Sequence, residues 1–336
     1  MKEKDEKLDV LRVMSMFLVI VIHLANYYCR AYHVISIPSY IGAIIFNAIA
    51  RVSVPIFFMI SGALLLSKPY DAKKNIARIK KMLITTILFT IVYLLWDHFF
   101  MGKKITHIIG LLTTPERSML WFLYAIIAIY IALPFTKCMV DNMKEREDKL
   151  FVILWLIFNG VYYILKGIFK LQIDYPIPII SGTYYLGYFI VGYIIYKYKD
   201  KIDYKKYNIL NILVLVMSLI CTIGITLYFS SKKDTYYSLY LAYRSLFVIA
   251  SSLSTFILLY TNLQNKKNKF INFISKYSFG VYLIHGMLLN ILMEKIFPYK
   301  EIISFIGIPI CFIILSVVSI IVVYLLKKIP VLKNYL

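Results

Sequence analysis

Long apolar stretches separated by short charged loops dominate the chain. A helix needs about 20 mainly apolar residues to cross the roughly 30 Å of hydrocarbon in a bilayer. These stretches are too long and too uniformly apolar for barrel strands. We therefore predict an all-α polytopic membrane protein, a bundle of about ten transmembrane helices. The predicted spans are 9–28, 40–66, 82–100, 119–136, 150–165, 179–196, 208–229, 238–262, 277–294 and 302–326.

The loops between these spans are short, so we expect residues 1–336 to form a single integral membrane domain with no fused soluble domain. Composition supports this, because 61% of the residues are apolar and 16% are charged. Soluble domains have about 45–50% apolar and about 25% charged residues. A soluble fold, a disordered chain and a disulfide-rich secreted fold are excluded on these figures.

The net charge of +21 would ordinarily suggest a nucleic-acid partner. Here the basic residues lie between apolar stretches, so we predict the lipid bilayer as partner and no nucleic acid. Of the 38 lysines and arginines, 25 lie in the termini and alternate loops, 10 in the other loops and 3 within spans. By the positive-inside rule both termini are cytoplasmic in a multi-pass protein of the cytoplasmic membrane.

Several common catalytic patterns are missing from the sequence. The four cysteines are widely separated without a C-x-x-C pair, so we predict no metal site and no obvious disulfide. The chain also lacks G-x-x-x-x-G-K-[ST], H-E-x-x-H and G-x-S-x-G. It is therefore not an ATPase, a zincin or a serine hydrolase of the usual pattern.

Ionisable residues within the first span are the leading functional candidates, since such groups are costly at membrane depth. Arg12 and His23 are eleven residues apart, about three full helical turns, so they share one face about 16 Å apart. Asn26 lies near the same stripe. Arg12 has an alternative interpretation, as a residue snorkelling at the membrane edge and paired with Asp9. His23 lies deeper, where an imidazole can serve as a general base.

Two further basic groups lie within other spans. Arg51 is expected near mid-bilayer in the second span, where it either meets an anionic group or bonds helix carbonyls. Pro55, Ser61 and Gly62 predict an irregularity in that span where backbone could line a cavity. His285 in the ninth span is equally well interpreted as structural or functional.

No carboxylate lies near the centre of a span. Ion-coupled transporters commonly carry one in a relay, so its absence weakens a transport function. It also leaves His23 without an evident carboxylate to orient its ring. Aromatic residues near span ends, including Tyr28, Trp121 and Tyr185, are typical of an interfacial belt.

Four sequence motifs together resemble the acyltransferase-3 family of bacterial membrane O-acyltransferases. The stretch LDVLR and the histidine eleven residues after its arginine are similar to an Arg-x10-His signature. The segments ARVSVPIFFMISGALLL, LWFLYAIIAIYIALP and YSFGVYLIHG resemble the family's F-F-x-x-S-G, W-F-L and S-x-G-x-Y-L-x-H stretches. The resemblance follows the whole chain in order and includes the ten-span count.

This resemblance implies transfer of an acyl group, preferably acetyl, from cytoplasmic acyl-CoA (acetyl-CoA). The acceptor would be a hydroxyl of an extracytoplasmic envelope glycan or lipid-linked saccharide. His23 would be the general base or a transient acyl carrier. Arg12 would hold the phosphate or pantetheine end of the donor, and Arg51 would stabilise the oxyanion. No permanently bound cofactor is expected.

The remaining site predictions concern donor phosphates and substrate contacts. Arg78 and Lys81 are expected to attract coenzyme A phosphates, although the positive-inside bias alone explains a basic loop. The family often has R-x-x-R here, and Lys81 in the second position weakens a bidentate grip. Trp121 and Tyr124 would stack on sugar or line an acyl channel, with interfacial packing as the alternative, and His285 would support the site.

Two other classes of function stay open at this point. A flippase or exporter of a lipid-linked or polymeric saccharide would also need polar stripes around a central cavity. Coenzyme A binding separates that class from an acyltransferase. A membrane sensor or anchor is the third class, and it should tolerate loss of both His23 and Arg51.

Overall fold

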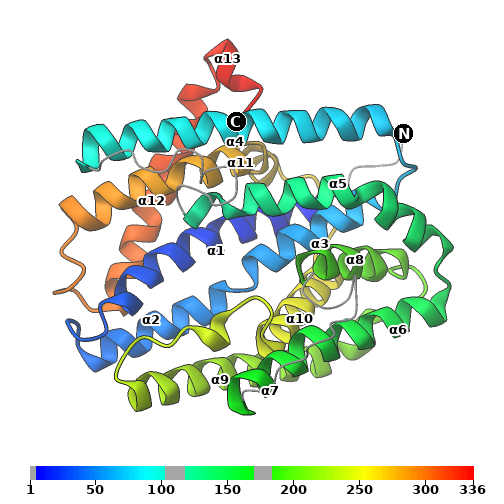
Figure 1. The fold of residues 1–336 in the computed structure, drawn as a ribbon, viewed down its shortest axis with the longest axis horizontal. Coiled ribbons are helices and arrows are strands. Elements are labelled where there is room, and N and C mark those ends of the chain that lie inside the picture. The colour runs from blue at the N-terminus through cyan, green and yellow to red at the C-terminus, as the bar shows by residue number, and fades with distance from the viewer. Residues whose placement is uncertain (1–4, 103–117, 170–183) are drawn as a thin grey trace.

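The computed structural model describes residues 5–102, 118–169 and 184–336 (Figure 1). Within these ranges the regular structure is entirely helical, which confirms the all-α prediction. The α-helices are α1 Glu6–Arg30, α2 Ile37–Ala50, α3 Ser53–Leu65, α4 Ala72–Met101, α5 Trp121–Asn142, α6 Glu145–Trp155, α7 Tyr162–Phe169, α8 Tyr184–Lys197, α9 Asn208–Lys233, α10 Leu246–Asn262, α11 Lys269–Ile291, α12 Ser304–Leu326 and α13 Pro330–Lys333. Two π-helical turns, Leu156–Val161 and Leu292–Ile296, join α6 to α7 and extend α11.

Nine helical segments within the described residues are long and apolar enough to cross a membrane. They match nine of the ten predicted spans. The tenth predicted span, 179–196, begins outside the described residues, and its described part is the 14-residue helix α8. The structure is therefore a polytopic helical membrane protein, as the apolar pattern predicts.

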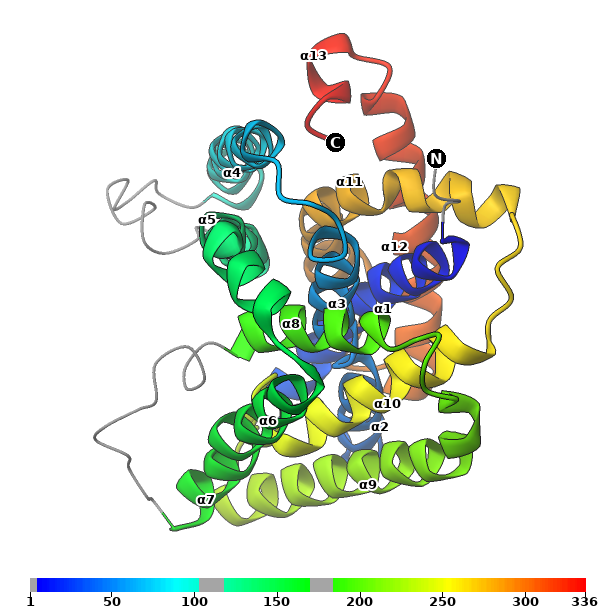
Figure 2. The same ribbon diagram turned by 90° about the vertical axis from the view of Figure 1, so that its right-hand side faces the viewer.

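Helix α1 runs through the middle of the bundle in both views (Figures 1 and 2). It packs against α2, α3, α10, α11 and α12. One face of α1, including Leu11 and Val19, belongs to a core cluster shared with α3, α5, α8 and α10. Another face, including Met16 and Ile20, belongs to a second cluster shared with α2, α11 and α12. A polar residue on α1 is thereby placed between two packed halves of the molecule.

The predicted second span is two helices rather than one. Helix α2 ends at Ala50, and α3 begins at Ser53 after a turn at Arg51 and Val52. Pro55 has no N–H to donate to the carbonyl of Arg51, four residues earlier, so the helical hydrogen-bond ladder is interrupted there. The irregularity was thus expected in the right span but several residues too late. The break puts Arg51 at a helix end in the middle of the span.

Gly62 lies inside a continuous helix, where the absence of a side chain allows a neighbouring helix to cross closely. A Cβ at position 62 would stand 1.7 Å from the backbone oxygen of Phe189 on α8. On the other side of the contact, a Cβ at Gly192 would stand 2.3 Å from the Cα of Met59 on α3. Small residues let membrane helices approach to backbone contact, which drives their association. The α3–α8 pair is packed in this way.

Helix α9, unlike the closely packed α3–α8 pair, lies on the lower edge of the bundle in both views (Figures 1 and 2). Its buried residues are small and polar and recur every four positions, at Ser218, Thr222, Thr226 and Ser230. That stripe faces α2 and α10, and large apolar side chains cover the exposed remainder. Helix α9 is therefore a peripheral helix suited to lipid contact.

Candidate functional site

A cavity of about 460 Å³ lies beside α1 and is lined by side chains from both halves of the bundle. Its lining includes residues of α1 from Arg12 to Arg30, a distance of about 27 Å along the helix axis. That distance approaches the roughly 30 Å of the hydrocarbon layer. We call the two ends of the cavity the Arg12 side and the Arg30 side.

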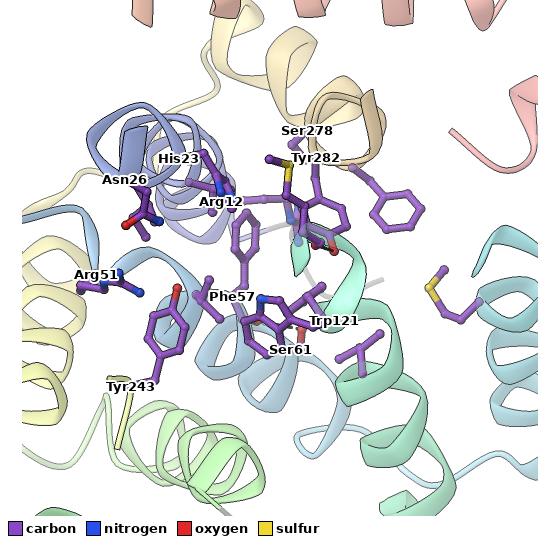
Figure 3. A pocket seen from close by; sticks show the side chains of 18 of the residues that line it. Arg12, His23, Asn26, Arg51, Phe57, Ser61, Trp121, Tyr243, Ser278 and Tyr282 are labelled. Carbon is purple, nitrogen blue, oxygen red and sulfur yellow. Dashed lines mark hydrogen bonds between the residues drawn. The ribbon is translucent and has the colours of Figure 1, made fainter. Parts of the chain in front are cut away.

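The α1 residues predicted to share a face do so. Arg12, His23 and Asn26 all line the cavity, and Figure 3 shows them projecting from the same helix. The eleven-residue spacing of Arg12 and His23 brings both side chains into one continuous space, as three helical turns require. His23 lies between the two ends, on the wall where the cavity meets α11.

Arg12 is held by a carboxylate and a hydroxyl. Its guanidinium forms an ion pair with Asp9, one turn earlier, and donates a hydrogen bond of 3.2 Å to Ser275 on α11. Ser275 in turn donates to the same Asp9 oxygen at 2.8 Å. The alternative pairing with Asp9 is therefore observed, but Arg12 is also part of the cavity wall.

His285 lies directly behind His23 and is fully buried. Their ring centroids are 5.2 Å apart. The Nδ1 atom of His285 lies 2.7 Å from the carbonyl oxygen of Tyr282 and 3.1 Å from that of Val281. Because carbonyls only accept, Nδ1 carries the proton and Nε2 is the acceptor. Nε2 is buried and has no hydrogen-bond partner among the residues that the structure describes.

Arg51 is held only by neutral groups. Its Nε donates to Oδ1 of Asn47 at 2.8 Å, and its guanidinium carbon lies 5.5 Å from the ring centroid of Tyr243. The Asn47 amide donates onward to Oδ1 of Asn26 at 2.8 Å. Among the described residues no carboxylate pairs with Arg51, and none lines the cavity. The positive charge of Arg51 is therefore available to an electronegative group of a ligand in the cavity.

An aromatic wall faces this arginine. Trp121 lines the cavity and stacks on Tyr185 with ring centroids 4.9 Å apart, and Tyr243 lies 5.8 Å from Trp121. Tyr28 is fully buried in the core. The burial of Tyr28 contradicts the interfacial-belt interpretation for that residue, and Trp121 lines the cavity, as its alternative interpretation predicts. Tyr124 is outside the cavity and packs half-buried against the α1–α11–α12 core cluster.

The structure explains the spacing inside two of the motifs. Phe57 and Ser61 of F-F-x-x-S-G are four residues apart and both line the cavity, while Gly62 meets α8. Ser278 and Tyr282 of the α11 stretch line it with the same spacing (Figure 3). One turn of helix separates each pair, so each motif presents an aromatic ring and a hydroxyl on the same face of its helix.

Two contributors, Asn47 and Tyr243, were not singled out by the sequence reasoning, and Ser278 and Tyr282 entered it only as part of the YSFGVYLIHG stretch, without a role of their own. Asn47 is four residues before Arg51, a spacing that could have signalled the contact. Tyr243 follows a short 3-10 turn, and nothing in its local sequence distinguishes it from the other 29 tyrosines.

Arg78 and Lys81 are not among the residues that line the cavity. Arg78 lies half-buried one turn before Met82, which does line it, and its charge acts on the cavity residue Tyr130. Lys81 is exposed, and its charge acts on Lys327 at the end of α12. Arg78 thus stands beside the Arg12 side of the cavity, and Lys81 stands farther out.

The fold and this site define a multi-span membrane protein whose internal cavity brings a histidine pair, an uncompensated arginine and an aromatic wall together. The acyltransferase-3 family model, described as an acyltransferase domain, matches residues 5–327. The chain belongs to this family, so it is a membrane acyltransferase in general terms. Comparison with curated proteins and with solved structures gave no match.

Proposed function

We propose that the protein is an O-acyltransferase that moves an acyl group, preferably acetyl, from acyl-CoA to a hydroxyl of a glycan or glycolipid. The observation that carries this proposal is the single cavity along α1, which reaches from Arg12 to Arg30 with His23 between. A donor entering from one side and an acceptor entering from the other can meet at His23. Neither substrate has to cross the membrane.

The orientation that we propose puts the Arg12 side in the cytoplasm, together with both termini, in the cytoplasmic membrane of a bacterium. The excess of lysine and arginine in alternate loops supports it. The acyl-CoA phosphates then arrive next to Arg12 and Arg78, with Lys81 adding positive charge nearby. The envelope glycan or lipid-linked saccharide arrives at the Arg30 side.

In the proposed reaction His23 removes the proton from the acceptor hydroxyl as its oxygen bonds to the thioester carbonyl carbon. Arg51 donates hydrogen bonds to the carbonyl oxygen as it becomes negative. The carbon–sulfur bond then breaks, and the sulfur takes the proton from His23. The products are an ester and free coenzyme A. Trp121 lines the channel for the acyl or sugar group, with Tyr124 packed one turn behind.

His285 is proposed as the positioning residue for His23. Its Nδ1 proton is committed to two backbone carbonyls, so its buried Nε2 can only accept. A hydrogen bond from His23 to that atom fixes which His23 nitrogen is protonated, and the other nitrogen faces the substrate as base. His285 would thus replace the carboxylate orienter that the membrane spans lack.

The decisive experiment is His23→Ala in purified, membrane-reconstituted protein, with His98→Ala as the matched control. His98 is exposed at the far end of α4, away from the cavity. We expect His23→Ala to lose acetyl-CoA-dependent acylation of envelope glycan, measured by mass spectrometry, while His98→Ala keeps it. Wild-type acylation by His23→Ala would overturn the mechanism.

A cavity reaching toward both sides also suits a flippase or exporter, so the donor must be tested separately. Calorimetry of the wild-type protein with acetyl-CoA should show binding. No binding, together with unmodified glycan in cells that carry the protein, would favour transport. An acetyl group found on His23 in the absence of acceptor would identify His23 as an acyl carrier rather than a general base.

A further inference from the structure

A second cavity of about 450 Å³ opens at the Arg30 side and shares His23, Asn26, Arg30 and Met119 with the first. Its remaining wall comes from the end of α1, the end of α11 with its π-helical extension, and the loop before α12. We call this space the vestibule. It has no part in the donor chemistry described above, and it leads to His23 from the acceptor's side.

Asn290 gives the vestibule an unsatisfied polar group. Its side chain lines the space although the residue is only 3% exposed. The hydroxyl of Tyr27 lies 2.8 Å from Oδ1 of Asn290 and 3.0 Å from Oε1 of Glu294. Nδ2 of Asn290 has no hydrogen-bond partner among the described residues.

A hydroxyl has one proton and a carboxylate only accepts, so Tyr27 can serve both residues together only by donating to Glu294 and accepting from Asn290. Turning the Asn290 amide over would satisfy its nitrogen and leave its oxygen unpaired instead. In either orientation, one polar atom of this buried amide therefore lacks a partner in the described part of the chain. Burying a polar atom without a hydrogen-bond partner costs free energy. A ligand hydroxyl both donates and accepts, so it can bind the Asn290 amide in either orientation.

The charged residues of the vestibule favour an anion. Arg30 and Lys300 line it, and Glu294 is the one carboxylate among its lining residues. Glu294 is within hydrogen-bond distance of Tyr27. Among the described residues neither Arg30 nor Lys300 forms an ion pair. The charged residues that line the first cavity are Arg12, Arg30 and Arg51, so no carboxylate among its described lining residues opposes an anion beyond Glu294.

Tyr299 supplies the remaining feature expected of a saccharide subsite. Its ring lines the vestibule and meets Tyr27 and Tyr28 edge-on, with centroids 5.7 Å and 5.5 Å away. A fixed aromatic ring offers a face against which the C–H side of a sugar can pack. Hydroxyl-binding, anion-binding and aromatic groups thus surround one space.

We propose that the vestibule is the acceptor subsite and that the acceptor is a saccharide carrying an anionic group. Asn290 binds a ring hydroxyl, Tyr299 packs on the ring, and Arg30 and Lys300 bind the anion. This proposal rests on the proposed function, because it names the acceptor class for the same histidine. It is nevertheless testable without any acyl transfer, because binding alone can be measured.

The experiment uses the full chain in phosphatidylcholine nanodiscs, which carry no net surface charge. Calorimetry measures the affinity for N-acetylglucosamine 1-phosphate, glucuronic acid, N-acetylglucosamine and inorganic phosphate. We expect the two anionic sugars to bind about tenfold more tightly than the neutral sugar, the amount typical of a charge-assisted hydrogen bond. Comparing the two anionic sugars distinguishes a phosphate from a carboxylate acceptor.

The variants separate the two kinds of contact. Arg30→Gln and Lys300→Gln should each weaken binding of the anionic sugars by about threefold, so that the two losses together account for the tenfold preference, and leave the neutral sugar unchanged. Asn290→Leu should weaken all three sugars. Lys295→Gln is the matched control, because Lys295 is next to Glu294 but its Nζ donates to the carbonyl of Phe100 and it does not line the vestibule. Affinities should be unchanged in that variant.

Three results would overturn the proposal: no sugar binds the wild-type protein, the neutral sugar binds as tightly as the anionic ones, or phosphate alone binds as tightly as the sugar phosphate. Release of thiol from acetyl-CoA is measured in the same samples. Absent thiol release with normal sugar binding counts against the acyltransferase only, and normal thiol release without sugar binding counts against the vestibule only.

Discussion

Two arginines of the cavity are bound in opposite ways. Arg12 pairs with the carboxylate of Asp9 and shares Ser275 with it, so its charge is balanced inside the protein. Arg51 contacts an amide oxygen and an aromatic ring, and both are neutral. The sequence placed both arginines within spans, and only the structure distinguishes the balanced charge from the unbalanced one.

The difference separates a cation whose charge a protein carboxylate already balances from one whose charge only a ligand can balance. A buried charge without a partner is expensive, and proteins keep one where function requires it. Arg12 ties α1 to α11, and its removal should first affect stability. Arg51 adds no ion pair to the described fold, and its removal should first affect chemistry. The predictions that follow test this division.

The largest effect is expected for Arg51→Gln. Loss of one donor to a developing oxyanion typically lowers kcat by about 10²–10³-fold. We therefore expect acetyl transfer to fall by that amount while the thermal melting temperature in detergent stays near wild type. Arg51→Lys should recover part of the rate, because it restores charge but not the forked geometry. If the variant also melts well below the wild-type temperature, Arg51 has a structural role and the lower rate does not show a role in chemistry.

Next in size is Gly62→Ala, which tests the helix crossing that positions the start of α3 just after Arg51. The added Cβ would meet the Phe189 oxygen at 1.7 Å, and backbone cannot yield as a side chain can. We expect the free energy of unfolding to fall by an amount near the upper end of the 1–3 kcal/mol typical of overpacking. Gly224→Ala on α9 is the control, because nothing lies within 4 Å of its Cβ position. That change should leave unfolding unaffected or raise stability by up to about 1 kcal/mol.

Arg12→Gln should destabilise the protein by removing the ion pair of the buried Asp9 carboxylate, which keeps the Ser275 hydrogen bond but loses its contact with the positive charge of Arg12. Removing one partner of a fully buried pair costs about 3–5 kcal/mol. The Arg12 side chain is 29% exposed and that of Asp9 4%, so we expect about 2 kcal/mol. The double variant Asp9→Asn with Arg12→Gln should recover much of the loss in thermal unfolding. A double variant no more stable than Arg12→Gln would show that the ion pair is not the cause.

The part of the molecule that follows from simple periodicity was predictable from sequence. The apolar stretches identified the helical membrane fold, and the eleven-residue spacing placed Arg12 and His23 on one face of α1. Arg51 was found because an arginine within an apolar span is conspicuous. Each inference used only distances along one helix, which the chain itself determines.

Contacts between distant helices could not be inferred in this way. His285 meets His23 across 262 positions of sequence, and the acceptor state of its Nε2 depends on two backbone carbonyls. Gly62 was interpreted as an irregularity, because a glycine at a helix crossing and one at a break look alike in sequence. The vestibule depends on the turn of α1 that carries Tyr27 meeting the end of α11, so neither half predicts it alone.

The smallest effect is expected at Asp71, which repeats the Asp9–Arg12 spacing in water. Asp71 caps α4, accepts from the Lys74 backbone at 3.0 Å and pairs with its exposed Nζ. These hydrogen bonds lower the pKa of the Asp71 carboxyl below 3.8. The contribution of Asp71 to stability is therefore complete above pH 3.8 and lost as the pH falls through the lowered pKa.

Asp71→Ala should lower the melting temperature at pH 7 by less than Arg12→Gln does, and the difference from wild type should vanish in acid. Asp200→Ala, which removes another exposed carboxylate, should change neither. If Asp71→Ala equalled Arg12→Gln in size, burial would not be what makes the Asp9–Arg12 pair more stabilising than the exposed Asp71–Lys74 pair.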